Sequence, residues 1–137
     1  MTTRRALVVG VAALVVGLAI YLVARRGTEL HALLGIGGGT VALPGFVRDN
    51  LPDALWQFAF CVAVLAIWQD APRSAWRALP LAIGLGAELA QATGVVPGTF
   101  DLLDLGAMAI ASWAAAIVMT PRQPETACDT RSSTATA

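Results

Sequence analysis

Long apolar runs separated by short polar segments dominate the chain. At a rise of 1.5 Å per residue, a helix of roughly 20 residues crosses a hydrocarbon core of about 30 Å. Four runs have this length, and the predicted spans are residues 6–24, 51–68, 77–96 and 100–119. We therefore expect an all-α membrane protein, built as a four-transmembrane-helix bundle.

Residues that start and stop helices delimit the last three runs. Asn50 is suited to cap the second run, and Pro52 is suited to its first turn. Gly94 is a natural stop for the third run. Thr99 is suited to cap the fourth run, which Pro121 closes.

The first run also has the position of a signal peptide. Signal peptides, however, have shorter apolar cores of about 7–15 residues, followed by a small-residue cleavage site. No such site precedes Arg25. We interpret the run as a retained first span.

The segment that follows contains the sequence GIGGGT. Each glycine costs about 1 kcal/mol relative to alanine inside a helix. We therefore expect residues 25–50 to form an interfacial outer loop with a short amphipathic helix, rather than a fifth span.

Arginine positions orient the bundle, since cytoplasmic loops are enriched in positive charge. With the N-terminus inside, four spans leave three arginines outside: Arg25, Arg26 and Arg48. The cytoplasmic arginines are then Arg4, Arg5, Arg73, Arg77, Arg122 and Arg131. A fifth span would move four of these six outside. We expect both termini to be cytoplasmic, with residues 121–137 as a disordered tail.

Small residues recur on one face of three spans, which lets helix backbones approach closely in lipid. They are Gly10 and Gly17 on the first span, Ala82, Gly86 and Ala90 on the third, and Ala107, Ala111 and Ala115 on the fourth. We expect these faces to pack inside the bundle.

Composition narrows the function. The chain is 57% hydrophobic and 13% charged, whereas a soluble domain is about a quarter charged. Its zero net charge argues against nucleic acid as a partner. Cys61 and Cys128 match neither a disulfide framework nor a metal motif, and His31 is expected to be a solvated loop residue. No cofactor and no metal are predicted.

Polar side chains inside the apolar runs are the strongest functional signal. A carboxylate near the bilayer centre costs at least about 2.5–3.5 kcal/mol, so Glu88 should face the bundle interior. We predict an outward-facing ligand-binding pocket made of Asp53, Gln57, Glu88, Gln91, Asp101 and Asp104. The structural alternative is a Glu88–Gln91 hydrogen bond worth about 0.6 kcal/mol, with helix capping explaining Asp53 and Asp101.

This pattern resembles the VanZ-like family of small bacterial integral membrane proteins. The family pattern is an Asp followed four residues later by His, then Glu-x-x-Gln, then an outer turn leading to an Asp. Asp53, Glu88, Gln91 and Asp104 match it, and the stretches LPDALW and GTFDLLD are similar to a subset of the family. The resemblance covers the second span to the fourth.

The chain departs from the family pattern at three positions. Gln57 stands in place of the His, Gly98 in place of an outer-turn Arg, and Met108 in place of an Asn. Acid–base chemistry through that His is therefore not expected here. The family takes its name from a protein linked to teicoplanin resistance, which implies a role in the cell envelope.

Three functions compete. The first is a multi-pass protein of the bacterial cytoplasmic membrane whose pocket binds an envelope lipid, a cell-wall component or a glycopeptide-type ligand. A phosphate-bearing lipid would need protonated carboxyls, a bridging cation or help from Arg48, because carboxylates repel phosphate. The second is an enzyme on a lipid-linked substrate that uses Glu88 and Asp104. The third is a structural subunit that contacts a second copy or another membrane protein. No catalytic residue is named.

Overall fold

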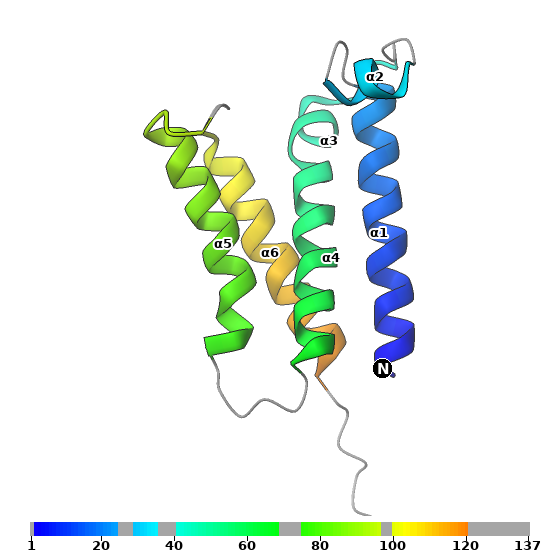
Figure 1. Ribbon diagram of the computed structural model, residues 1–137, viewed down its shortest axis with the longest axis vertical. Helices are drawn as coiled ribbons and strands as arrows, with labels where there is room; N and C mark the ends of the chain where they lie inside the picture. Colours follow the sequence, from blue (N-terminus) through cyan, green and yellow to red (C-terminus); the bar gives the residue numbers. More distant parts are fainter. Residues whose placement is uncertain (1, 25–28, 36–40, 69–74, 97–99, 121–137) are drawn as a thin grey trace, which may run out of the picture.

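The computed structural model describes residues 2–24, 29–35, 41–68, 75–96 and 100–120 (Figure 1). These residues form helices and contain no strand. The helices are α1 (Thr3–Ala24), α2 (Glu29–Leu34), α3 (Gly45–Asp49), α4 (Leu51–Ile67), α5 (Ala75–Ala92) and α6 (Leu102–Met119). The predicted all-helical fold is confirmed.

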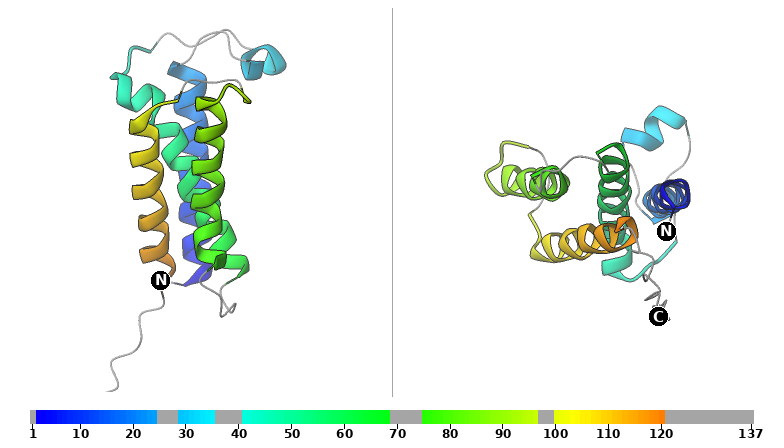
Figure 2. Two further views of the ribbon diagram at one scale, coloured as in Figure 1. Left: turned by 90° about the vertical axis from the view of Figure 1, so that its left-hand side faces the viewer. Right: turned by 90° about the horizontal axis from the view of Figure 1, so that it is seen from below.

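The four long helices α1, α4, α5 and α6 run alternately up and down (Figures 1 and 2). The starts of α1 and α5 and the ends of α4 and α6 lie at the lower end of Figure 1, whereas α2 and α3 lie at the upper end. Helix α4 contacts α1, α3, α5 and α6. It therefore occupies the middle of the bundle, with α6 beside it and running in the same direction.

The third predicted span, 77–96, is too long at its C-terminal end. Helix α5 ends at Ala92, and Gly94 adopts a left-handed φ of 73°. The Val95 backbone N–H then donates to the Ala90 carbonyl over 2.9 Å. This left-handed closure satisfies carbonyls that the helix leaves free and turns the chain back.

The start of the fourth predicted span is also displaced. The N-cap of α6 is Asp101, whose Oδ1 accepts a 2.9 Å hydrogen bond from the Leu103 backbone N–H. The predicted cap Thr99, the closing Pro121 and the predicted tail 121–137 lie outside the described residues.

Two short helices, α2 and α3, occupy the described part of the predicted outer loop, so the described chain has four long helices. Helix α3 continues almost directly into α4, because the Asn50 N–H donates to the Phe46 carbonyl and the Asn50 carbonyl accepts from Ala54, each over 3.0 Å. Asn50 is itself helical and its side chain makes no capping hydrogen bond. The predicted cap was wrong, and the Asn50 side chain is free for another partner.

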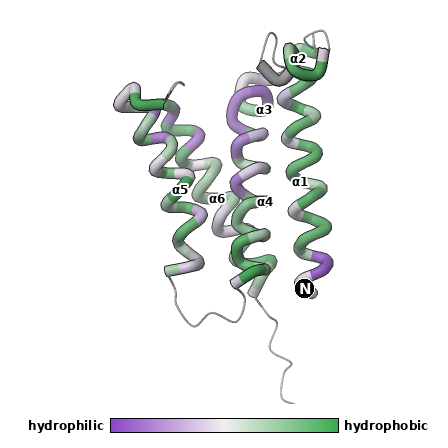
Figure 3. Tube along the Cα trace, in the orientation of Figure 1, coloured by the Kyte–Doolittle hydropathy of each residue, from purple (hydrophilic) through white to green (hydrophobic). Residues whose placement is uncertain are grey.

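Two helices, α1 and α6, are long and apolar enough to cross a membrane. In the most apolar 18-residue segment of each helix, only 17% and 22% of the residues are buried within the chain, whereas the core helix of a soluble protein is mostly buried. The apolar helices Leu51–Ile67 and Ala78–Ala92 are shorter. Hydrophilic residues gather on α3 and the upper part of α4, whereas most of α1 is hydrophobic (Figure 3).

The glycine face of α1 packs against α4, as predicted. A Cβ at Gly10 would lie 3.3 Å from Val62 Cγ1, and a Cβ at Gly17 would lie 2.8 Å from Trp56 Cδ1. Val62 is fully buried, and the Trp56 ring lies 6.0 Å from the Tyr21 ring between centroids. The two helices approach this closely only because the two glycines lack side chains.

The alanine face of α6 is also inside, since Ala111 and Ala115 are buried. On α5, by contrast, the predicted face is wrong. Ala82 is exposed, and a Cβ at Gly86 would meet no atom within 4 Å. Helix α5 instead turns Gly84 and Glu88 inward. The buried face of α5 carries Pro80, Gly84 and Glu88 at four-residue spacing, so it is not the face with the repeat of small residues.

His31 is only 3% exposed, so the prediction of a solvated side chain was wrong. Its Nε2 lies 2.8 Å from the Leu22 carbonyl oxygen. This carbonyl belongs to the last turn of α1, where backbone acceptors lack intrahelical partners. His31 therefore fastens α2 to the end of α1.

Gly17→Ala should destabilise the bundle by about 1–3 kcal/mol, because the new methyl group would overlap the Trp56 ring. The matched control is Gly86→Ala, which adds the same methyl group in open space and should be neutral or stabilising by up to about 1 kcal/mol. Thermal unfolding of both variants in detergent measures the difference. Equal melting temperatures would contradict the α1–α4 packing.

Candidate functional site

The start of α6 gathers carboxyl groups. Asp101 caps the helix, and Asp104 lies in its first turn. Both positions are favourable for acidic side chains, because the N-terminal end of a helix carries a partial positive charge worth about 0.3–1 kcal/mol per carboxylate. The local sequence FDLLDL thus accounts for two of the acidic residues.

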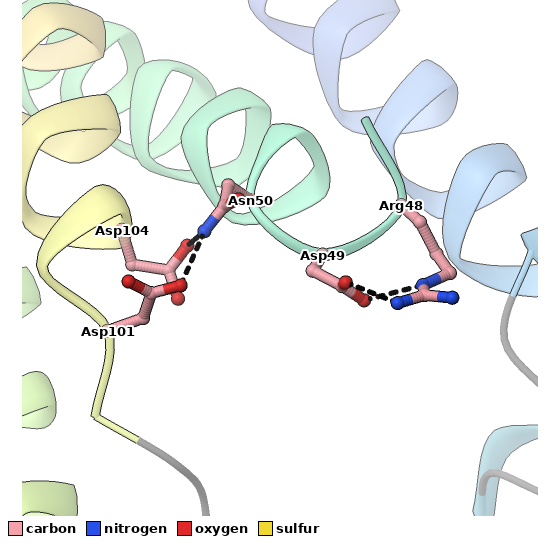
Figure 4. A network of polar contacts seen from close by, with 5 residues as sticks. All are labelled: Arg48, Asp49, Asn50, Asp101 and Asp104. Carbon is pink, nitrogen blue, oxygen red and sulfur yellow. Dashed lines mark hydrogen bonds and ion pairs between the residues drawn. The ribbon is translucent and has the colours of Figure 1, made fainter. Parts of the chain in front are cut away.

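Asn50 joins the start of α4 to this end of α6 (Figure 4). Its Nδ2 donates to Asp104 Oδ1 over 2.7 Å and more weakly to Asp101 Oδ2 over 3.4 Å. The contact is possible because α4 and α6 run in the same direction, with their starts at the same end. Asn50 is 3% exposed, so this amide is a buried link between two helices.

Glu88 approaches the same place from α5. Its side chain is 4% exposed, and its carboxyl lies beside the Asp101 backbone and the Asp104 and Asp101 carboxyls. Its Oε2 is buried and has no hydrogen-bond partner among the described residues. We refer to Glu88, Asp101 and Asp104, with Asn50, as the carboxyl cluster.

Arg48 does not neutralise this cluster. Its Nε and Nη2 donate to Asp49 over 2.9 and 2.7 Å, and the pair faces away from Asp101 and Asp104 (Figure 4). The hydrogen bond and the negative charge of Asp49 raise the pKa of Arg48 above its usual value. Among the described residues, Arg48–Asp49 is the ion pair found, so the cluster lacks a cationic partner there.

Gln57 lies about two turns further along α4 and belongs to a different set of contacts. Its Nε2 lies 2.9 Å from the Pro80 carbonyl oxygen, 3.1 Å from Ser112 Oγ and 3.6 Å from Cys61 Sγ. The Cys61 thiol in turn donates to Ser112 Oγ over 3.4 Å. We refer to these four residues as the Gln57 network, which links α4, α5 and α6.

Helices α4, α5 and α6 also approach one another closely beside this network. A Cβ at Gly84 would lie 2.9 Å from Gln57 Oε1 and 3.2 Å from Met108 Sδ. At the lower end, the rings of Trp68 and Trp76 stack with centroids 4.2 Å apart. Gln57 therefore fills the contact between helices, and its side-chain amide bonds to Pro80 and Ser112 rather than to the carboxyl cluster.

The remaining predicted pocket residues lie nearby. Asp53 is half-buried on α4, one turn from Asn50. Gln91 is half-buried on α5, one turn beyond Glu88, but the two side chains do not hydrogen-bond. The structure therefore places Glu88 near Asp101 and Asp104, and the hydrogen bond of the structural alternative, between Glu88 and Gln91, is not formed.

Sequence reasoning missed two contributors. Asn50 was assigned to capping, and no local pattern pairs it with an aspartate more than 50 residues away. Ser112 was not singled out from the sequence, although it lies on the α6 face that meets Gln57. The signal that identifies Ser112 is its four-residue spacing from Met108 and eight-residue spacing from Asp104, which places the three on one side of α6.

The chemistry available at the cluster is acceptance of hydrogen bonds and attraction of positive charge. No three His, Cys, Asp or Glu side chains of the described residues converge to hold a metal ion. Ser112 contacts an amide and a thiol, neither of which is a general base. The geometry therefore favours binding over nucleophilic catalysis.

In comparisons with known proteins, no family model, no curated protein and no solved structure matches the chain.

Asn50→Ala should destabilise the protein by about 1.5–3 kcal/mol, because hydrogen bonds to charged groups have that range of values. Asn50→Asp should be worse, since it replaces the donor with another carboxyl. Combining Asn50→Asp with Asp104→Asn restores a donor–acceptor pair and should recover part of the loss. Thermal unfolding of the full double-mutant cycle tests this coupling. Additive effects would contradict the Asn50–Asp104 contact.

Proposed function

We propose that the chain is an integral membrane protein of the bacterial cell envelope, resembling VanZ-like proteins, that binds an envelope lipid or cell-wall ligand at the carboxyl cluster. Glycopeptide-type ligands belong to the same proposal. Helices α1, α4, α5 and α6 cross the cytoplasmic membrane, both termini are cytoplasmic, and the cluster faces outward.

The observation that carries this proposal is the buried Oε2 of Glu88, which has no partner among the described residues. Buried polar atoms are almost always hydrogen-bonded, and an unpaired one costs about 1–3 kcal/mol or more if it is charged. A ligand that donates to this oxygen would remove the cost. A purely structural role would instead favour a satisfied carboxyl.

The alternation of the long helices supports the proposed topology. Arg4 and Arg5 lie in the first turn of α1, and α4 ends and α5 begins at this same end. The sequence between α4 and α5 includes Arg73. The carboxyl cluster lies towards the opposite end, near α3. This arrangement agrees with the rule that positive charge is retained in the cytoplasm.

The residues behind the VanZ-like resemblance support the proposal unequally. Glu88 and Asp104 are in the cluster, whereas Gln57, at the position of the family His, is bonded within the helix packing. The proposed ligand site therefore rests on carboxyl groups and needs no acid–base chemistry at position 57.

Topology is tested by cysteine accessibility in a Cys61→Ala, Cys128→Ala background. A membrane-impermeant maleimide added to intact cells should label Gly98→Cys and should label Ser74→Cys only after the cells are opened. The opposite labelling would invert the orientation. Labelling of both positions from outside would mean that α5 does not cross the membrane.

Ligand binding is tested by comparing wild type with Glu88→Gln. The variant should copurify with less envelope lipid in native mass spectrometry, while its melting temperature in lipid-free detergent stays equal or rises. The reason is that functional sites commonly sacrifice stability, so neutralising a buried carboxyl relieves a cost.

Gln57→Leu is the contrasting control, because it removes hydrogen bonds that hold helices together. It should lower stability by about 0.6–1.5 kcal/mol without a specific loss of lipid. If Glu88→Gln instead loses about 1 kcal/mol or more and retains its lipid, Glu88 is structural and the proposal fails.

A further inference from the structure

The carboxyl cluster is rich in hydrogen-bond acceptors and poor in donors. Glu88, Asp101 and Asp104 bring three carboxyl groups together from α5 and α6. The side-chain donor present is the Asn50 amide, which already donates to Asp104 and Asp101. The Leu103 backbone N–H is likewise used by Asp101. Glu88 Oε2 therefore has no donor left within the described residues.

The cluster also lacks positive charge. Arg48, in the last turn of α3, donates from two nitrogens to Asp49 and faces away from the cluster (Figure 4). A ligand with a phosphate as its contacting group would add negative charge to three carboxyls, which repel it. A contacting group that supplies both N–H donors and positive charge would complete the site.

The positions of the carboxyl groups favour an ammonium group over a metal ion as the cation. No three acidic, His or Cys side chains of the described residues converge on a point that would hold a metal ion. A primary ammonium group carries three N–H donors that point in different directions, so it can reach carboxyls that are separated from one another. Hydrogen bonds between an ammonium and carboxylates are also among the strong ones.

The surroundings favour a lipid as the source of that ammonium. Leu102 and Leu103, in the first turn of α6, are 73% and 60% exposed, and Val95, which follows α5, is 77% exposed. Along the chain, these apolar residues lie between Glu88 and Asp104, two members of the carboxyl cluster. A headgroup at the cluster would therefore have apolar surface beside it for its acyl chains.

We infer that the carboxyl cluster binds a primary ammonium group, and that its source is the headgroup of an aminophospholipid. Glu88 Oε2 accepts one N–H, and Asp104 and Asp101 accept the others. The ammonium takes the place of the missing cation, and the phosphate stays in the aqueous layer. This inference rests on the proposed function, because it assumes that the cluster is a ligand site at the membrane boundary.

The probes are phosphatidylethanolamine and phosphatidylcholine with identical acyl chains, added to the full-length protein in detergent micelles. Both headgroups carry a cationic nitrogen beside an anionic phosphate, but the trimethylated nitrogen has no N–H. Native mass spectrometry should show phosphatidylethanolamine bound about tenfold more tightly, the factor that corresponds to losing one charge-assisted hydrogen bond. Equal retention of the two lipids would overturn the inference.

Three variants assign the effect to the cluster. Glu88→Gln and Asp101→Asn should each reduce the preference for phosphatidylethanolamine over phosphatidylcholine. Asp101→Asn keeps a side-chain oxygen for helix capping. Asp49→Asn is the matched control, since it removes a carboxyl that is paired with Arg48 and faces away. Asp49→Asn should keep the wild-type preference for phosphatidylethanolamine. A loss of preference as large as that of Glu88→Gln would overturn the inference. Far-UV circular dichroism verifies that each variant is folded.

Further experiments distinguish a lipid from a soluble amine as the source of the ammonium group. They also distinguish failure of the ammonium inference from failure of the proposed function. Soluble ethanolamine that displaces phosphatidylethanolamine and stabilises lipid-free protein in a Glu88-dependent manner would keep the ammonium site but assign it to a soluble amine. Glu88-dependent retention of phosphatidylglycerol alone would overturn the ammonium inference and leave the proposed pocket standing. Retention of every lipid without dependence on Glu88 would overturn both.

Discussion

The structure depends on finding hydrogen-bond partners for the polar face of α4 inside an apolar bundle. Asn50 and Gln57 are 3% and 7% exposed, so neither can rely on water. Gln57 donates to groups on α5 and α6 as well as within α4, and Asn50 donates to two carboxyls of α6. Because unsatisfied polar groups are costly in an apolar medium, these contacts determine how α5 and α6 lie against α4.

The opposite face of α4 is apolar and packs against α1. Against α1 it presents Val62 and Trp56, which fit over glycines that lack side chains. Here the helices associate through close packing, which is the main driving force when the surroundings are as apolar as the helices. Helix α4 thus joins an apolar contact on one side to a polar contact on the other, and both α4 and α6 contact α1 and α5.

The two polar sites on the other face of α4 differ in how completely they are satisfied. In the Gln57 network, the amide, thiol and hydroxyl contact one another, so each of these groups has a hydrogen-bond partner. In the carboxyl cluster, one oxygen of Glu88 remains unpaired beside two further carboxyls. A fully satisfied network stabilises a unique helix arrangement, whereas a partly satisfied one retains the capacity to bind. The two sites therefore differ in role although they lie a few helical turns apart. The Gln57 network holds the helices together, whereas the carboxyl cluster is the proposed ligand site.

Periodicity and composition by themselves determined the number of long helices, their approximate bounds, the packing faces of α1 and α6, and the inward position of Glu88, because each follows from residues close together in the sequence. Tertiary structure alone decided which polar residues meet. Asn50 reaches Asp104 and Gln57 reaches Ser112 because α4 and α6 run side by side in the same direction, so residues more than 50 positions apart share a level. It also decided which of two faces of α5 is buried, since either Gly84 or Gly86 permits close approach and only the neighbouring helices select between them.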